Sequence, residues 1–273
     1  PYLYKYKVDG VPTDFDYASG KLHKFTVKVS KKEQTGVEFE VISVAITAWE
    51  ADNASHQDDA REYVVVHSPE AGRLEKTMVD RLEMDVTAIK NLKLTGYINT
   101  DDYYFMRDKM TSLMRLNLKE VESLIDGVYR IPMSAFYGKK SLIKCILPDK
   151  LERIEGEYAG KNPFAGTSLT GTLQLPEGLK YVSGFDSTNI TNVIFPSTLE
   201  EIGENAFYYC RSLMCEISLP ASLKKIGYQA FAYSAISGNL VLPEGLEDIG
   251  SNAFSSCQNL TGSLRIPQGI KVI

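Results

Sequence analysis

The chain has 273 residues with a formal net charge of −5 at pH 7; 44% of its residues are hydrophobic and 24% are charged. These proportions are typical of a globular protein. The negative balance argues against a nucleic-acid partner, which would require a basic stripe, and no run of 18 or more apolar residues is present to span a membrane. Because the chain begins at Pro1, we interpret it as a processed product from which an export signal has been removed.

Residues 1–72 show the alternation of β-structure. Apolar and polar residues alternate over 24–30, the alternation returns over 37–49, and a further β-rich run covers 62–68. A period of two is typical of half-buried strands. Several short strands separated by polar turns predict a small β-sandwich of the immunoglobulin-like kind.

Part of this segment resembles a known module. The stretch 49–66 is similar to the second half of a BACON domain, which tends to show a Trp, then an Asn, then an Arg opening the last strand; here these are Trp49, Asn53 and Arg61. BACON domains are often found near the front of exported bacterial proteins, so the resemblance implies export.

Residues 69–89 carry a different pattern. Apolar residues recur there every four positions and then after three, at Leu74, Met78, Leu82, Val86 and Ile89. This stripe predicts a helix. We expect the helix to cap the repeat domain predicted for 73–273, because the first coil of a solenoid lacks a neighbour on one side.

A weak repeat signal begins at residue 90. Thr100 or Asp101 is expected to be the N-cap of a short helix that runs through Met110, since a short side-chain oxygen there accepts from free backbone N–H groups. The pattern LxxLxL follows at 113–118, as expected for a leucine-rich repeat strand.

The remaining chain is periodic. Pro196, Pro220, Pro243 and Pro267 are 24, 23 and 24 residues apart, and spacings of 28, 21, 22, 24 and 23 separate six phenylalanines: Phe136, Phe164, Phe185, Phe207, Phe231 and Phe254. A fixed period of this size indicates a solenoid in which each coil buries its apolar side against its neighbours. We therefore expect the six rings to lie in one line.

Three further columns accompany the phenylalanines. A glycine lies four residues before the phenylalanine of a coil (Gly160, Gly203, Gly227, Gly250), and an amide lies two residues before it (Asn162, Asn205, Gln229, Asn252). An alanine lies directly before it (Ala206, Ala230, Ala253). We expect the glycine to provide a positive φ, the amide to satisfy backbone groups of the bend, and the alanine to let coils approach.

These columns resemble the BspA-like leucine-rich repeats, surface proteins of anaerobic bacteria and some protists. The match is specific in the last three coils, where Leu219, Pro220, Ile226, Gly227 and Phe231 follow the pattern, and the resemblance covers about 90–273. It implies a leucine-rich repeat solenoid with a parallel β-sheet. With the small N-terminal β-sandwich predicted for 1–72 from its alternation, the expected fold is a mixed α+β chain. The resemblance also implies a protein that is exported to the cell surface or secreted.

The sequence offers little for catalysis. Cys210 and Cys257 share a column with Ser234 and are expected to be buried in the coils, too far apart for a disulfide. The acidic turn around His56 (Asp52, Asp58, Asp59) does not have the spacing of a calcium loop, and Asp101 with Asp102 is better explained by helix capping. Because no nucleophile elbow, zinc or phosphate-loop motif is present, we expect a protein that is not an enzyme and needs no cofactor or metal.

The most informative surface is the outward side of the strand row. Twelve side chains alternate there with inward leucine and isoleucine: Lys144, Ile146, Thr172, Gln174, Asn192, Ile194, Glu216, Ser218, Asn239, Val241, Ser263 and Arg265. The row has one carboxylate and no aromatic ring. It therefore disfavours acid–base catalysis and sugar stacking, and it suits a flat protein contact.

The sequence predicts a non-catalytic cell-surface adhesion protein whose repeat face contacts a protein of a host or neighbouring cell. The alternative is a carbohydrate-binding surface protein that uses the N-terminal domain as its sugar module, with stacking residues Tyr2, Tyr4, Tyr6, Tyr17 and Trp49.

The sequence ends within a repeat. In the last coils an isoleucine precedes each phenylalanine by five residues, whereas no phenylalanine follows Ile273. Since an open coil end needs a polar cap, we expect that the natural chain continues or that a partner covers this end.

Overall fold

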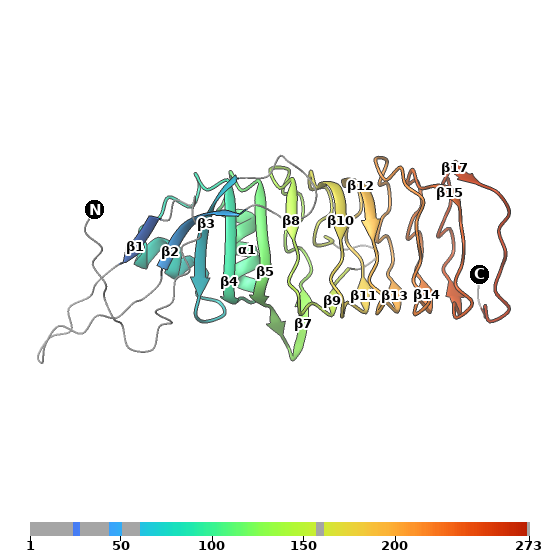
Figure 1. Ribbon diagram of the computed structural model, residues 1–273, viewed down its shortest axis with the longest axis horizontal. Coiled ribbons are helices and arrows are strands. Elements are labelled where there is room, and N and C mark those ends of the chain that lie inside the picture. Colours follow the sequence, from blue (N-terminus) through green and yellow to red (C-terminus); the bar gives the residue numbers. More distant parts are fainter. Residues whose placement is uncertain (1–23, 28–43, 51–60, 157–160, 272–273) are drawn as a thin grey trace, which may run out of the picture.

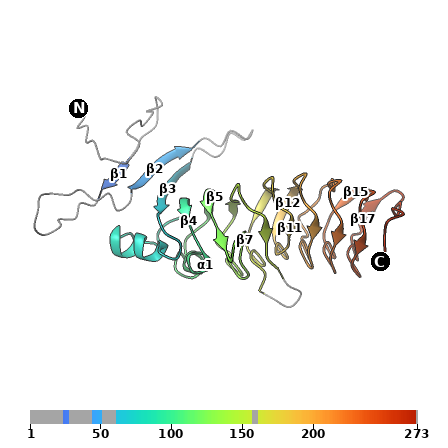
Figure 2. The same cartoon turned by 90° about the horizontal axis from the view of Figure 1, so that it is seen from below.

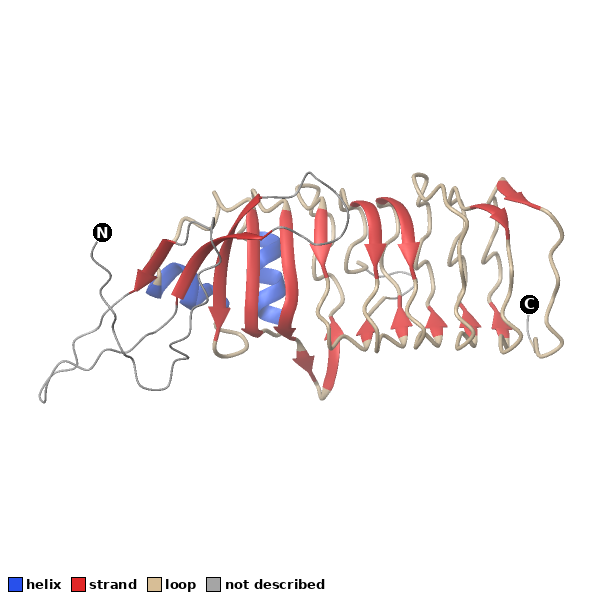
Figure 3. Cartoon of the chain, viewed as in Figure 1, coloured by secondary structure: helices blue, strands red, loops and turns tan. Residues whose placement is uncertain are grey.

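The computed structural model describes residues 24–27, 44–50, 61–156 and 161–271. The repeats form one elongated stack of coils (Figure 1), and residues 24–27 and 44–50 extend from its N-terminal end (Figure 2). From residue 144 on, each complete coil runs along one long face, turns at a proline, adds a short strand to a second face, and returns through a turn that carries the phenylalanine (Figure 3). The coil at 213–219 lies on the long face without forming a strand. The predicted solenoid over 90–273 is confirmed for the described residues, and the parallel pairing of its strands follows from the repeated direction of each coil.

The longer strands build what we call the long-strand face. Its main sheet has the order β1 (Lys24–Val27), β2 (Val44–Glu50), β3 (Arg61–Ser68), β4 (Asn91–Tyr97), β5 (Arg115–Glu122) and β8 (Lys144–Ile146). Two parallel pairs continue it along the stack: β10 (Thr170–Gln174) with β12 (Asn189–Ile194), and β15 (Ser237–Asn239) with β17 (Asn259–Thr261).

The shorter strands build the short-strand face. β6 (Leu124–Ile125) and β7 (Val128–Ile131) form an antiparallel hairpin, and β7 starts a parallel series with β9 (Arg153–Ile154), β11 (Tyr181–Val182), β13 (Glu201–Ile202), β14 (Lys225–Ile226) and β16 (Asp248–Ile249). Each of these two-residue strands places an isoleucine or valine in the core, as the buried Ile202 and Ile226 show.

The core is organised by a single aromatic column. Neighbouring ring centroids are 5.5 Å apart for Phe136 and Phe164, 4.8 Å for Phe164 and Phe185, 5.8 Å for Phe185 and Phe207, 5.3 Å for Phe207 and Phe231, and 5.5 Å for Phe231 and Phe254. The predicted line of six rings is confirmed. Tyr103 of α1 (Thr100–Asp108) adds a seventh ring at the start, 5.7 Å from Phe136 and edge-on to it.

The positive φ predicted for the glycine column falls on the amide column instead. Gly227 and Gly250 do not have a positive φ; the left-handed positions fall on Asn205, Gln229 and Asn252 at φ 51°, 50° and 59°. A Cβ on Gly227 would lie 2.6 Å from the backbone nitrogen of Glu204. The glycines therefore allow the backbones of successive coils to touch. Gly203 also has no positive φ, but a Cβ there would meet the side chain of Tyr181 rather than backbone, and Gly160 lies outside the described residues.

The cap of α1 also differs from the prediction. The N-cap is Asn99, whose side chain accepts from the N–H of Asp101 at 3.0 Å, so neither Thr100 nor Asp101 has that role. Buried Asp102 completes a capping box by accepting from the N–H of Asn99 at 2.9 Å. Its carboxylate also accepts from the N–H groups of Gly72 at 2.6 Å and Leu74 at 2.9 Å, which attaches the preceding segment to the helix.

The helix predicted over 69–89 is only partly right. Its buried stripe is present at Leu74, Met78, Val86 and Ile89, but helical structure is limited to residues 74–81, of which Lys76–Arg81 form the π-helical element η1. The side chain of Asp85 accepts from both the N–H and the hydroxyl of Thr87. Such local side-chain bonds offer the backbone an alternative to the helix.

The segment predicted as a β-sandwich contributes β1, β2 and β3 to the long-strand face. β1–β2 and β2–β3 pair antiparallel, while β3 pairs in parallel with β4, with Val64 opposite Leu92 and Val66 opposite Leu94. Most of 1–60 lies outside the described residues, so the β-sandwich at 1–72, the domain boundary after 72 and the BACON resemblance stay predictions.

The aromatic column predicts a large cost for removing one ring. Phe207→Ala should lower the free energy of unfolding by about 3–5 kcal/mol, because Phe207 is fully buried between Phe185 and Phe231. Phe195→Ala is the matched control, since Phe195 meets Phe207 edge-on and is only partly buried. Urea denaturation followed by circular dichroism measures both, and equal losses would contradict the column's importance.

The close approach at Gly227 and the left-handed φ at Gln229 give a second prediction. Gly227→Ala should lower the free energy of unfolding by about 1–3 kcal/mol, because the new methyl group overlaps the neighbouring backbone. Gln229→Gly should change stability by less than about 1 kcal/mol, because relief of the left-handed strain opposes the greater freedom of the unfolded chain. Urea denaturation measures both variants. A larger loss of stability for Gln229→Gly than for Gly227→Ala would contradict these roles and favour those expected from the sequence.

Candidate functional site

The predicted row of twelve side chains lies on the long-strand face. β8 carries Lys144 and Ile146, β10 carries Thr172 and Gln174, and β12 carries Asn192 and Ile194. The remaining six follow in the next three coils, where Asn239 ends β15. Lys144, Ile146 and Asn192 are half-buried, whereas nine are exposed: Thr172, Gln174, Ile194, Glu216, Ser218, Asn239, Val241, Ser263 and Arg265.

The row exposes more apolar surface than its composition suggested. Ile194 is 45% exposed and Val241 is 64% exposed, while their inward neighbours Val193 and Leu242 are buried. Met214, which the sequence analysis missed, is 71% exposed and precedes Glu216 by two residues, so it continues the same alternation. Extending the period of two by one step would have found it.

Charges on the short-strand face are paired from coil to coil. Glu200 meets Lys224 at 3.0 Å, Glu201 meets Lys225 at 3.1 Å, and Glu152 lies 3.8 Å from Lys180. Arg153 lies over the Tyr181 ring at 4.3 Å. This face therefore uses many of its charged groups to join successive coils. In the twelve-residue row, Arg265 pairs with Glu244 outside the row at 3.2 Å.

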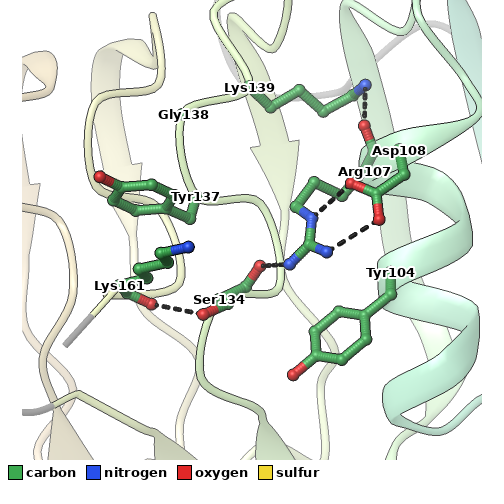
Figure 4. Close-up of a pocket in the computed structure, with 8 residues that line it drawn as sticks. All are labelled: Tyr104, Arg107, Asp108, Ser134, Tyr137, Gly138, Lys139 and Lys161. Carbon is green, nitrogen blue, oxygen red and sulfur yellow. Dashed lines mark hydrogen bonds and ion pairs between the residues drawn. The ribbon is translucent and has the colours of Figure 1, made fainter.

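A cavity of about 530 Å³ lies between α1 and the first phenylalanine turn. Figure 4 shows Tyr104, Arg107 and Asp108 projecting from α1 toward Ser134, Tyr137 and Lys139 of the next coil, with Lys161 on the far side. This site could not be predicted from the sequence, because it depends on contacts between α1 and residues of the next coil that lie far from it in the chain.

The charged groups of this cavity hold the coils together. Arg107 donates to the carboxylate of Asp108 at 2.7 and 2.8 Å and to the carbonyl of Ser134 at 2.7 Å. The Lys139 ammonium donates to the carbonyls of Arg107 and Met110 at the end of α1, at 3.0 and 2.8 Å. Burial lowers the pKa of Lys139 to about 8, and the hydrogen bond from Arg107 lowers the pKa of Asp108. The cavity is therefore a structural joint, with its carboxylate held ionised.

A second aromatic group lies on the side of the phenylalanine turns. Tyr208 and Tyr209 follow Phe207, and Tyr233 projects from the next coil. Their ring centroids are 5.9 Å apart for Tyr208 and Tyr209, 5.8 Å for Tyr208 and Tyr233, and 6.1 Å for Tyr209 and Tyr233. The Arg211 guanidinium lies 4.0 Å from the Tyr209 ring centre and donates to its hydroxyl. We call these four residues the tyrosine cluster.

Cys210 and Cys257 are buried, as predicted, whereas Cys145 and Cys215 are half-buried. The thiols of Cys210 and Cys257 donate to the carbonyls of Phe185 and Phe231 at 3.1 and 3.0 Å. Burial raises the pKa of Cys210 to about 11 and that of Cys145 to about 12, so neither thiol forms a nucleophilic thiolate readily near neutral pH. All four cysteines are free.

The other candidate residues find little support as a site. Asp52, His56, Asp58 and Asp59 lie outside the described residues, and Asp102 is used in capping. Within the described ranges, no group of three or more histidine, cysteine and acidic residues could hold a metal ion. Neither helix of the described chain is long and apolar enough to cross a bilayer.

The chain is similar to a protein of known structure and to a known family. A leucine-rich repeat protein from Bacteroides ovatus with a known crystal structure aligns with 94% of this chain and 67% of its own, at 16% identity and a TM-score of 0.45. No curated protein matches. The family described as "BspA type Leucine rich repeat region" matches residues 103–183 and 181–273 in six copies. The chain therefore belongs to the BspA-type leucine-rich repeat family.

Proposed function

We propose that this chain is a non-catalytic binding protein, exported to the cell surface or secreted, which contacts a protein partner through the long-strand face. The observation that carries the proposal is the outward row, where Ile194, Met214 and Val241 are exposed on a surface of small polar side chains. Leucine-rich repeat proteins are solenoids, and solenoids use such extended faces for binding.

The composition of the row supports a protein rather than a glycan or a nucleic acid. Fully buried cores of protein interfaces are poor in charge and rich in apolar residues such as methionine, and Glu216 is the one carboxylate among the twelve positions. The row contains no aromatic ring for stacking on a sugar and no stripe of cations for phosphates.

The contrast with the short-strand face points the same way. There, glutamate and lysine side chains pair between coils, as in Glu200–Lys224 and Glu201–Lys225. These charges already have partners within the protein, and exposed pairs of this kind give little affinity. The apolar side chains of the row gain by being covered, since burial of apolar surface is the main favourable term in association.

A charge in the centre of the row should therefore weaken binding strongly. Ile194→Lys and Val241→Lys together should weaken the complex by at least about 30-fold, as expected for a charge left unpaired in a desolvated interface. The measurement is surface plasmon resonance against a panel of purified extracellular matrix and cell-surface proteins, each tested before and after enzymatic deglycosylation.

The matched control is Leu124→Lys, because Leu124 on β6 is 50% exposed and lies away from the row. It should leave the affinity unchanged. Equal affinity of the row variant and the parent chain would contradict the proposed face. Binding that disappears on deglycosylation would instead favour the sugar-module alternative at 1–72.

A further inference from the structure

We propose that the tyrosine cluster is a second binding site, distinct from the row on the long-strand face, and that it takes an acidic, apolar segment of a partner protein. Tyr208, Tyr209, Tyr233 and Arg211 form it on the side of the phenylalanine turns. The proposal does not depend on the function assigned to the row, because the two surfaces share no residue.

Two of the tyrosines have an unusual backbone conformation. The residue two after each column phenylalanine has a left-handed conformation in all six coils, with φ between 57° and 68°. Four coils use a small residue there: Gly138, Gly166, Ser187 and Ser256. The other two use Tyr209 and Tyr233, both at φ 58°. A bulky residue with this φ is strained, and such strain gathers at functional sites.

The side chains of these two tyrosines are also exposed to solvent. Tyr209 and Tyr233 are 39% and 43% exposed. They belong to consecutive coils and project from the same column, so two strained positions give one surface. The fold does not need these rings, because glycine or serine serves the same turn elsewhere in the chain.

Arg211 indicates the chemistry of the partner. Arg211 is stacked on Tyr209 and held by its hydroxyl, and no described carboxylate forms an ion pair with it. A stacked guanidinium keeps donors in its plane that match a carboxylate. Tyrosine and arginine are the residues most enriched in the energetic centres of protein interfaces. A partner segment with an aspartate or glutamate beside apolar side chains therefore complements the cluster.

The test uses the whole chain and a phage-displayed library of random dodecapeptides. Selected peptides should share an acidic residue next to apolar residues. Their affinity should fall at least about tenfold for Tyr209→Ser with Tyr233→Ser and for Arg211→Gln, with part of the loss restored in Arg211→Lys. Selection that yields no peptides, or peptides without an acidic residue, would overturn the proposal.

Two controls separate this site from structural and other roles. Because Ser187 and Ser256 occupy the same turn position, the double serine variant should melt at or above the temperature of the parent chain; a clear drop would mean that the rings are structural and would overturn the proposal. Ile194→Lys with Val241→Lys should leave peptide binding unchanged. Binding of acidic glycans but not peptides on an array, lost in the same serine variant, would assign the cluster to sugars instead.

Discussion

Contact between the aromatic rings of successive coils is the interaction on which the rest of the structure depends. No coil has enough apolar surface to fold alone, and each ring is covered only when the next coil is in place. The column from Tyr103 to Phe254 therefore fixes the distance between coils as well as their stability. Both strand faces inherit this spacing, and so does every outward side chain available for binding.

The same spacing divides the sequence into constrained and free positions. Gly227 must lack a side chain because the neighbouring backbone occupies that space, and Cys210 and Cys257 lie at buried positions where their thiols donate to a phenylalanine carbonyl of the preceding coil. The outward positions of the long-strand face meet no such requirement, and the exposed Met214 occupies one of them. Tyr209 occupies a turn position that requires a left-handed φ but leaves the side chain exposed. The proposed binding surfaces therefore lie where the repeat leaves the side chain exposed.

Much of the solenoid could be predicted from its period, because apolar residues that recur at fixed spacing must share one core. The outward row followed from the alternation of strands. The roles of Gly227 and Gln229 could not be predicted, since a glycine required by a close neighbour and one required by its own φ look alike in a sequence. The cavity beside Lys139 and the first ring of the column, Tyr103, depend on a coil lengthened by the β6–β7 hairpin, which hides their register.

The parallel pairing of β3 with β4 has a mechanical consequence. Five residue pairs, from Val64–Leu92 to Ser68–Gly96, join the last strand of the N-terminal segment to the first strand of the repeats. The segment that ends in β3 is thus attached by a ladder of hydrogen bonds rather than by a swivelling tether. A load applied along these strands would shear many bonds at once, so the orientation of the proposed binding faces would be kept under tension.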